Sequence, residues 1–390
     1  MNFDEITDRR NSGSLKWDGI EKICGVPADT GLPMWVADTD FRSADCIQDA
    51  VRGMLDHGIY GYVGDRVEYK AAIGWWMENR HDWRIEPDWI FTTHGLCNAV
   101  GLCLQAFTRP GDAVLLFTPV YHAFARVIEA AGREVSECTL KNVDGRYEMD
   151  FEAAAARLTG REKAVILCSP HNPGGRVWNH AELRELADFC AAHDLLLIAD
   201  EIHHDLVFPG HKHLPMPVAA PEISDRLVML TAPSKTFNTA GTHTGNVIIM
   251  DDGLRRTFAQ VMTAISISPN NFGREMARAA YSEAGAVWLD AQMEYLEGNR
   301  RLFDQGVDAI PGFVSMPLQA TYLAWVDFSA TGMAPAEFTR RVEQVAKIAA
   351  NHGSTFGSGG ESFLRFNLGT QRARIAEAIA RLRDAFADLQ

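Results

Sequence analysis

The chain has 390 residues, of which 47% are hydrophobic and 23% charged, so it can form a large core and two domains. Its 37 Lys and Arg against 51 Asp and Glu give a formal net charge of −14, which argues against nucleic acid or an anionic membrane as the main partner. The seven cysteines are odd in number and lack metal-ligand spacing, so we expect reduced thiols and no metal site. Without a signal-peptide pattern or a membrane-length apolar stretch, a cytoplasmic location is expected.

The two ends of the chain differ from its middle. Residues 1–45 are rich in turn formers, and the last hundred residues combine helical patterns with one expected strand at 321–326. We therefore predict a large α/β domain at 46–285 and a smaller α+β domain built from 1–45 and 286–390.

A glycine precedes the first clear helical pattern of the large domain. Gly95 stands just before the apolar residues that recur from Val100 to Phe107. Its backbone can approach a ligand closely, and the amides of Leu96 and Cys97 would then face a phosphate at the helix start. A glycine before a helix is commonplace, so this motif alone is a weak indication.

Five short apolar runs in the middle of the chain have the length of strands buried on both faces. They lie at 113–117, 164–168, 195–199, 227–230 and 247–250. Between the second and the third, Leu183, Leu186, Ala187 and Cys190 recur on one helix face. This βαβ unit predicts a mainly parallel sheet covered by helices.

Polar side chains follow three of these runs. Asn172 follows the second run, Asp200 and His203 follow the third, and Lys235 follows the fourth. Because ligands bind beyond the carboxyl ends of strands in open α/β sheets, we expect these groups to meet in one crevice. A lysine just beyond a buried strand is costly to desolvate, and one chemistry that uses this placement is a Schiff base with pyridoxal phosphate (PLP).

PLP needs the groups expected around this lysine. A carboxylate such as Asp200 keeps the pyridine nitrogen protonated, so that the ring can draw electrons from the substrate's α-carbon. Asn172 and His203 can donate hydrogen bonds to the ring's 3′-oxygen. Each residue alone has a structural explanation, such as a solvated acid or a satisfied core histidine. Their convergence with Lys235 favours the cofactor site.

Two further residues suit the same site. Tyr121 follows the run at 113–117 and could stack on a planar ring, although a core aromatic explains it equally well on local grounds. Arg365 lies in an apolar run that holds no carboxylate. Because its planar guanidinium matches a carboxylate, we expect it to bind that of a substrate.

Together these residues resemble the fold-type I PLP enzymes of the aminotransferase class I/II superfamily, and most closely the MalY/PatB-type cystathionine β-lyase (carbon–sulfur lyase) branch. The segments that carry the resemblance are Asp8-Arg9-Arg10, Ser14-Leu15-Lys16-Trp17-Asp18, Trp35-Val36-Ala37-Asp38-Thr39-Asp40-Phe41, His57-Gly58-Ile59-Tyr60-Gly61-Tyr62, Ser169-Pro170-His171-Asn172-Pro173-Gly174-Gly175-Arg176-Val177-Trp178 and Asp200-Glu201-Ile202-His203. The resemblance implies the aspartate aminotransferase fold and a PLP-dependent enzyme that works as a homodimer.

The resemblance also implies a role for each matching residue at the cofactor. Lys235 would bond PLP and shuttle the proton, and Asp200 would pair with the pyridinium. Asn172 and His203 would contact the 3′-oxygen, and Tyr121 would stack on the ring.

On the substrate side, the resemblance implies that Arg365 grips the α-carboxylate and that the backbones of Val36 and Ala37 line the pocket. Tyr62 would reach the cofactor of the neighbouring subunit, so that the active sites of the dimer are shared.

Two positions and one turn depart from the family pattern. The turn is Asn351-His352-Gly353, which replaces a more usual proline-glycine turn. Ala232 stands three residues before the lysine, where relatives usually have a serine, and His243 stands where many carry another basic or an amide side chain. Phosphate binding is therefore expected to depend on Ser234, His243, the amides at the helix start and Tyr62.

Three functions stay open at this point. We favour a carbon–sulfur β-lyase that converts cystathionine or cysteine S-conjugates to pyruvate, ammonia and a thiol, because the closest motifs belong to the lyase branch. Return of the proton to the cofactor's C4′ carbon would instead make an aminotransferase of a small or aromatic amino acid. The third is a PLP-binding regulatory protein with residual lyase activity, although the acidic chain has no DNA-binding extension.

Overall fold

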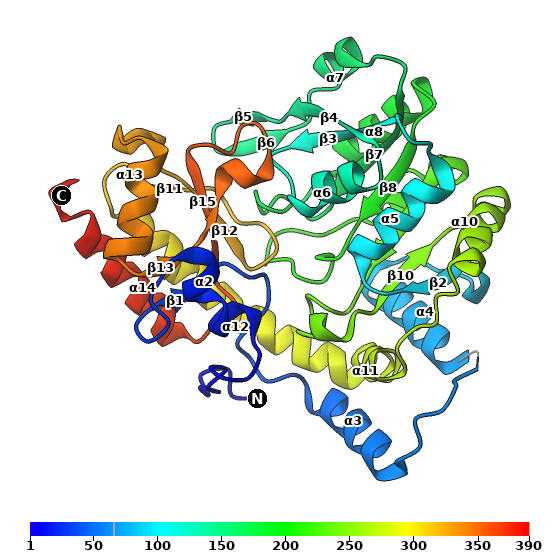
Figure 1. The fold of residues 1–390 in the computed structure, drawn as a ribbon, viewed down its shortest axis with the longest axis horizontal. Helices are drawn as coiled ribbons and strands as arrows, with labels where there is room; N and C mark the ends of the chain where they lie inside the picture. Colours follow the sequence, from blue (N-terminus) through cyan, green and yellow to red (C-terminus); the bar gives the residue numbers. More distant parts are fainter. Residues whose placement is uncertain (65–66, 390) are drawn as a thin grey trace.

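A seven-stranded sheet forms the centre of the larger part of the molecule (Figure 1). The computed structural model describes residues 1–64 and 67–389. The strand order is β2-β10-β9-β8-β7-β3-β4. These strands are β2 (Ile90–Thr93), β3 (Ala113–Thr118), β4 (Glu134–Thr139), β7 (Glu162–Cys168), β8 (Leu196–Asp200), β9 (Leu227–Thr231) and β10 (Gly245–Ile248). Among these seven strands, only β10 runs in the opposite direction to the others, so the mainly parallel sheet is confirmed.

Both faces of the sheet are covered by helices. Along β7, Val165 and Leu167 belong to one core cluster, while Ala164 and Ile166 belong to another, because successive side chains of a strand point to opposite faces. One face packs against α5 (Leu96–Phe107), α6 (Ala123–Ala130) and α10 (Asp252–Ala264). The other packs against α4 (Val67–His81), α7 (Phe151–Arg157), α8 (His180–Ala192), α9 (Met216–Ala219) and α11 (Asn271–Ala280).

The predicted βαβ unit is confirmed as β7-α8-β8, with β7 and β8 parallel. Asn179 caps α8 in a capping box with Glu182, which satisfies amides that the helix start would otherwise leave unpaired. The predicted apolar face of this helix is buried: Leu183, Leu186, Ala187 and Cys190.

Some strand predictions need correction. The strand predicted at 195–199 is β8, which begins and ends one residue later. The strand predicted at 247–250 is β10, which begins and ends two residues earlier. Ile249 and Met250 are apolar but lie beyond the pairing of β10 with β9, so hydrophobicity alone misplaces that strand. β2 and β4 were not predicted. β4 lies at the edge of the sheet, and its side chains are mostly partly or fully exposed.

The second, smaller body contains an antiparallel sheet of order β11-β12-β15-β14. These strands are β11 (Val314–Ser315), β12 (Leu323–Asp327), β14 (Asn351–His352) and β15 (Phe363–Asn367). The strand predicted at 321–326 is thus β12, two residues later at its start. The helices beside this sheet are α12 (Glu283–Asp308), α13 (Pro335–Arg340) and α14 (Arg372–Ala385). A small hairpin, β5 (Lys141–Val143) with β6 (Arg146–Glu148), extends from the larger part.

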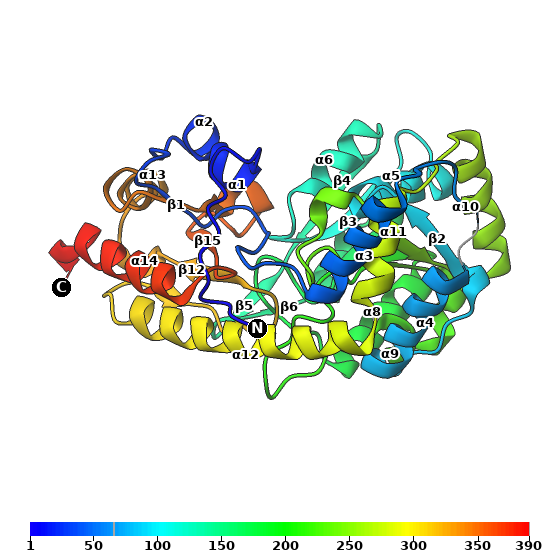
Figure 2. The same ribbon diagram turned by 90° about the horizontal axis from the view of Figure 1, so that it is seen from below.

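Segments from the two ends of the chain lie side by side in this smaller body (Figure 2). β1 (Leu32–Pro33) pairs parallel with β13 (Ile348–Ala349). The N-terminal helices α1 (Leu15–Asp18) and α2 (Ile20–Cys24) lie beside the C-terminal elements, whereas α3 (Asp45–His57) packs on α11. The long helix α12 runs from one body into the other (Figure 2). The domain limits at residues 45 and 286 stay predictions.

No helix in the described part of the chain is long and apolar enough to cross a membrane. All seven cysteines carry free thiols, in agreement with the expectation from their spacing.

Candidate active site

A cavity of about 350 Å³ lies beyond the carboxyl ends of the central strands. The strand ends are nearly level, since Cys168 at the end of β7 is opposite Asp200, and Asp200 is opposite Leu230 of β9. The cavity brings together all but one of the residues predicted to hold the cofactor, together with the substrate-side Ala37. These are Gly95, Leu96, Cys97, Tyr121, Asn172, Asp200, His203, Ser234, Lys235 and His243. The predicted crevice therefore exists, and it lies where the topology of the sheet places it.

Lys235 is the nucleophile candidate in this cavity. It follows the fully buried strand β9, and its Nζ donates a hydrogen bond of 2.8 Å to the carbonyl of Ala37. The Oη of Tyr322 donates to the same carbonyl at 3.1 Å. Burial, and next the positive charge of Arg365, lower the pKa of Lys235. A lowered pKa favours the neutral amine, which is the form that attacks a carbonyl carbon or removes a proton.

Asp200 provides the acid of the site. It is only 5% exposed, and one carboxyl oxygen accepts a hydrogen bond of 3.1 Å from the amide of Ile202. Burial raises the pKa of Asp200 to about 7. A cationic ring nitrogen beside this carboxyl would favour its charged form, as a nearby opposite charge always does. Asp200 therefore fits the role predicted for it.

Arg365 lies on β15 and is buried without a carboxylate. Its guanidinium donates to Asn172 Oδ1 at 2.8 Å, to the carbonyl of Trp35 at 2.9 Å and to Asn351 Oδ1 at 2.5 Å. No acidic side chain among the described residues forms an ion pair with it, and its Nε has no hydrogen-bond partner there. Burial lowers the pKa of Arg365 to about 10. A buried cation held by neutral groups is suited to binding an incoming carboxylate.

Asn172 and His203 are the two predicted partners of a ring oxygen. Because Asn172 accepts from Arg365 through Oδ1, its amide nitrogen remains the group that can donate. His203 is 2% exposed, and its Nδ1 has no hydrogen-bond partner among the described residues. Burial and the charge of Lys235 hold the pKa of His203 well below its usual value, so the imidazole is neutral at pH 7. An orphaned buried nitrogen at the cavity is consistent with a ligand atom as its partner.

The start of α5 forms the expected phosphate end of the cavity. Gly95 has φ +82° and caps the helix without a side-chain hydrogen bond, a backbone conformation that favours glycine. The amides of the first turn thus lack a side-chain cap and can serve an anion. Thr244, which was not predicted, lines the cavity beside His243. Ala232 is 1% exposed and belongs to the apolar core cluster, so no hydroxyl comes from that position.

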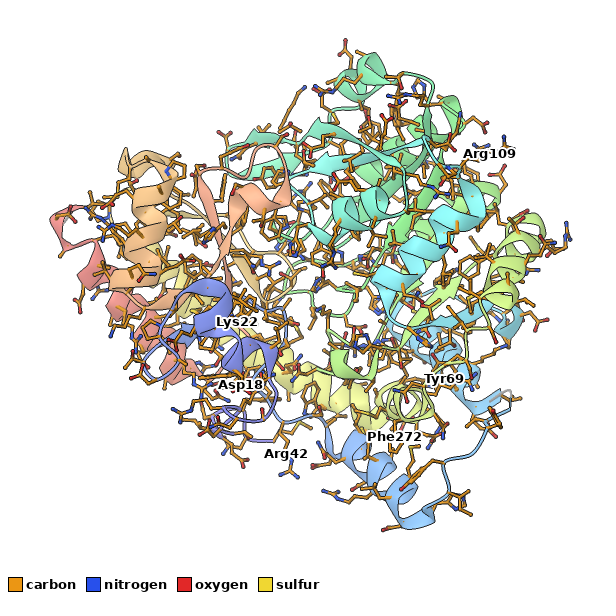
Figure 3. The ribbon with its side chains drawn as sticks, in the orientation of Figure 1. Asp18, Lys22, Arg42, Tyr69, Arg109 and Phe272 are labelled. Atoms are coloured by element: carbon orange, nitrogen blue, oxygen red, sulfur yellow. The ribbon has the colours of Figure 1, made fainter. Side chains whose placement is uncertain are left out.

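Three predicted residues lie outside the cavity lining. Arg365 donates a hydrogen bond to Asn172, which lines the cavity. The carbonyl of Val36 accepts a hydrogen bond from Asn367 Nδ2. Tyr62 is fully exposed and lines a separate, broad surface hollow. The ring of Tyr60, two residues before it, packs against that of Phe272 with 5.6 Å between the centroids. Figure 3 labels Phe272 on α11. Tyr62 therefore does not reach the cavity of its own chain.

A buried polar cluster supports the loop that carries Lys235. Thr236 Oγ1 donates to Asp205 Oδ2 at 2.7 Å, while Trp76 Nε1 and His81 Nε2 lie 2.9 and 2.8 Å from Oδ1. His81, His204 and Asp205 place ligand-type atoms within 4.8 Å of one another. Because Trp76 and Thr236 already donate to this carboxylate, we interpret the cluster as an anchor for the loop.

Sequence reasoning missed several residues of the site. Tyr322 and Asn351 contact site groups from the smaller body, and Thr244 and Arg126 line the cavity. No motif marks them, because each reaches the site through tertiary packing of segments distant in sequence.

The sheet order, the lysine loop and the polar strand ends together define the class of protein. The chain belongs to the aminotransferase class I and II family, whose model matches residues 47–382. It is 38% identical over 388 residues to cystathionine beta-lyase PatB of Bacillus subtilis (strain 168), with 99% of this chain and 100% of PatB covered. The resemblance to this family and to the PatB-type branch is thus confirmed.

Solved structures agree with this placement. Cystalysin from Treponema denticola, whose structure contains pyridoxal 5′-phosphate, superposes with a TM-score of 0.94 at 35% identity, covering 100% of this chain and 99% of cystalysin. A PLP-bound C-S lyase from Staphylococcus hominis superposes with a TM-score of 0.91 at 28% identity, covering 99% and 98% of the two chains. The predicted fold is confirmed.

Proposed function

We propose that this protein is a PLP-dependent carbon–sulfur β-lyase, which cleaves cystathionine or other cysteine S-conjugates to pyruvate, ammonia and a thiol. The observation that carries the proposal is one cavity lined by Lys235, Asp200 and Asn172, with Arg365 hydrogen-bonded to Asn172. The relatives named as a cystathionine beta-lyase and a C-S lyase support the lyase reaction.

The residues present fit the cofactor. The first amides of α5, Ser234 and His243 would hold the phosphate, with Thr244 beside them, and Asp200 would pair with the ring nitrogen. His203 and Asn172 would donate to the ring oxygen, and Tyr121 would stack on the ring. When bound, PLP supplies a ring that withdraws electrons from the substrate's α-carbon.

Lys235 moves the proton in this proposal. Its amine, with its lowered pKa, takes the proton from the substrate's α-carbon while Arg365 holds the α-carboxylate. The electron pair of that C–H bond forms a Cα=Cβ bond, and the thiolate departs from Cβ with the electrons of the C–S bond. Hydrolysis of the released enamine gives pyruvate and ammonia.

The product assay separates the lyase from its rivals. PLP-loaded protein is incubated with cystathionine, and pyruvate and thiol are measured against the oxo acid formed from an added amino acid. We expect equal amounts of pyruvate and thiol. Formation of the oxo acid without thiol would identify an aminotransferase instead. Absence of pyruvate, thiol and oxo acid would favour a regulatory role.

We further propose that the active unit is a homodimer whose sites are completed by Tyr62. The support is the full exposure of Tyr62 within a segment that also exposes Ile59 and Tyr60, since exposed apolar groups of this kind commonly mark interfaces. Tyr62 would donate to the phosphate bound in the partner subunit.

Mixing inactive variants tests this proposal. Lys235→Ala subunits mixed with Tyr62→Ala subunits should recover part of the activity, because one site in each heterodimer then holds both native residues. No recovery, despite demonstrated subunit exchange and inactive parents, would exclude a site completed in trans.

A further inference from the structure

A buried tyrosine of the smaller body shares a hydrogen-bond acceptor with Lys235. Tyr322 is fully buried and stands directly before β12. Its Oη donates to the carbonyl of Ala37 at 3.1 Å, and Lys235 Nζ donates to the same carbonyl at 2.8 Å. Because a carbonyl oxygen has two lone pairs, these two donors occupy both of them. The chemistry proposed above assigns no role to Tyr322.

The ring of Tyr322 packs against a second residue of the site. It lies edge-on to the imidazole of His203, with 6.3 Å between the ring centroids. Ala37 and His203 both line the cavity, and Tyr322 is not among the described residues that do so. Any effect of Tyr322 on the reaction therefore passes through these two neighbours.

A strained backbone places Tyr322 between them. The preceding residue, Thr321, is buried and has φ +73°, a conformation that a β-branched residue rarely adopts. Its amide donates to the carbonyl of Leu206 at 2.6 Å, and the amide of Leu206 donates to the carbonyl of His203 at 2.9 Å. Strain of this kind persists where the surrounding structure enforces it, commonly at functional sites. The fold therefore maintains the position of Tyr322 against strain.

The shared carbonyl restricts the orientation of the lysine amine. A neutral amine has two N–H bonds and one lone pair, and the lone pair accepts the proton. With one N–H of Lys235 held on the Ala37 carbonyl, the lone pair points away from that carbonyl. The hydroxyl of Tyr322 in turn holds the carbonyl in place. A proton transfer depends steeply on such alignment.

We propose that Tyr322 is a positioning residue for the proton transfer, because its hydroxyl orients the amine of Lys235 through the Ala37 carbonyl. The inference rests on the proposed function, which makes Lys235 the base, but it does not depend on the later loss of the thiol. A tyrosine with only a structural role would fill space with its ring and satisfy its hydroxyl. Removal of that hydroxyl would then change stability and leave the rate of proton removal as it is.

Exchange of the α-proton of L-alanine with D2O isolates this step. L-Alanine has no leaving group on Cβ, so exchange by the PLP-loaded protein requires only removal and return of the α-proton, which NMR follows. Tyr322→Phe keeps the ring and removes the hydroxyl. It should slow exchange about tenfold, while the L-alanine concentration at half-maximal rate changes by less than about twofold.

Tyr147→Phe is the matched control. Tyr147 is also buried, and its Oη accepts a hydrogen bond of 3.0 Å from Trp325 Nε1. Its loss should lower the thermal midpoint, because that indole N–H then lacks its acceptor, and should leave the exchange rate unchanged. Tyr322→Phe should lower the midpoint less, because the Ala37 carbonyl keeps Lys235 as a donor.

Thr321→Gly is a second variant, which keeps the hydroxyl and decides the question if Tyr322→Phe fails to fold. Glycine adopts this φ without strain, so the fold should be retained. The turn before Tyr322 gains conformational freedom, and exchange should slow by about two- to fivefold.

The outcomes separate this inference from the lyase proposal. Wild-type exchange rates in both Tyr322→Phe and Thr321→Gly, or an equal fall in Tyr147→Phe, would overturn the positioning role. Pyruvate and thiol from cystathionine test the lyase reaction independently. If neither product forms, while exchange is slowed in Tyr322→Phe and not in Tyr147→Phe, the lyase proposal fails and the positioning role stands.

Discussion

Burial and the neighbouring charges give the site residues their chemical roles. Lys235 has a lowered pKa because burial and Arg365 both disfavour the ammonium, whereas burial raises the pKa of Asp200 to about 7. The same low-polarity pocket thus favours the uncharged form of both groups. A bound cationic ring would favour the charged form of Asp200, while the neutral amine of Lys235 would be able to accept a proton.

Removing the acid should affect the rate more than the fold. Breaking one side of a buried carboxylate–cation pair typically costs about 3–5 kcal/mol, so Asp200→Ala should lower kcat by about two to four orders of magnitude. Asp200→Glu keeps the charge and should retain more activity. The measurements are kcat and the thermal midpoint of the PLP-loaded protein. Wild-type turnover in Asp200→Ala would show that this carboxyl is not at the ring.

Among the site residues, those that lie at or just beyond the ends of strands were predicted best from the sequence. Asn172, Asp200 and Lys235 were found because parallel strands deliver their carboxyl ends to one edge, a rule that needs no coordinates. Tyr322, Asn351 and Arg126 were not found, because each contributes through the way separate segments pack together. Tyr62 could be assigned only by resemblance, and in a single chain it stays outside the cavity.

Among the elements, the N-terminal segment is fixed by a buried ionic cluster. Asp40 accepts from Arg9 at 2.8 Å, from Lys16 at 3.0 Å and from Trp17 Nε1 at 2.9 Å. The positive charge of Lys16 and these hydrogen bonds outweigh burial and lower the pKa of Asp40. This cluster holds the stretch whose carbonyl at Ala37 contacts Lys235.

Loss of this carboxylate should destabilise the protein strongly. Asp40→Ala leaves Lys16, which is fully buried, without its closest anionic partner, and we expect the free energy of unfolding to fall by about 3–5 kcal/mol. Asp8→Ala is the matched control, because the Asp8–Arg10 pair is exposed and such pairs contribute little. Urea denaturation of both variants measures the difference. Similar midpoints for the two would contradict this account of the segment.

Strand prediction succeeded where both faces of a strand are buried. β3, β7 and β9 are continuous apolar runs and were located within a residue or two. β4 was not predicted, because an edge strand does not need a continuous apolar run. The predicted start of β10 was two residues late, because the apolar run continues beyond the last residue that pairs with β9. The amino-acid composition of β10 does not indicate that it runs antiparallel to the other strands.

At the scale of the whole molecule, several buried histidines couple stability to pH. Burial lowers the pKa of His81 to about 4, of His122 to about 4 and of His171 to about 3, and that of His203 in the same direction. In the unfolded chain each titrates near pH 6.5. Between pH 6.5 and 4 the unfolded chain therefore binds protons that the folded chain excludes.

Stability of the cofactor-free protein should accordingly fall as the pH is lowered from 6.5 to 4. Each such histidine contributes a slope of about 1.4 kcal/mol per pH unit. The pKa values of Asp200 and Asp304 are raised in the folded state. These two carboxyls therefore stabilise the folded chain as the pH falls over this window, but they are outnumbered by the four histidines. Urea midpoints at pH 6.5, 5.5 and 4.5 measure the slope within this window.

A single substitution checks the origin of this slope. His171→Gln should reduce it by about 1.4 kcal/mol per pH unit, even if the variant is less stable at pH 7. His211→Gln replaces an exposed imidazole and should leave the slope as it is. An unchanged slope in His171→Gln would show that this ring is not excluded from protonation.

The central claim is that the cavity holds PLP covalently on Lys235. Borohydride reduction of the PLP-loaded protein, followed by proteolysis and mass spectrometry, tests it most directly. We predict the mass of reduced PLP on the peptide that contains Lys235, and no stable label in the Lys235→Ala variant. Label on a different lysine, or full lyase activity in Lys235→Ala, would contradict the account.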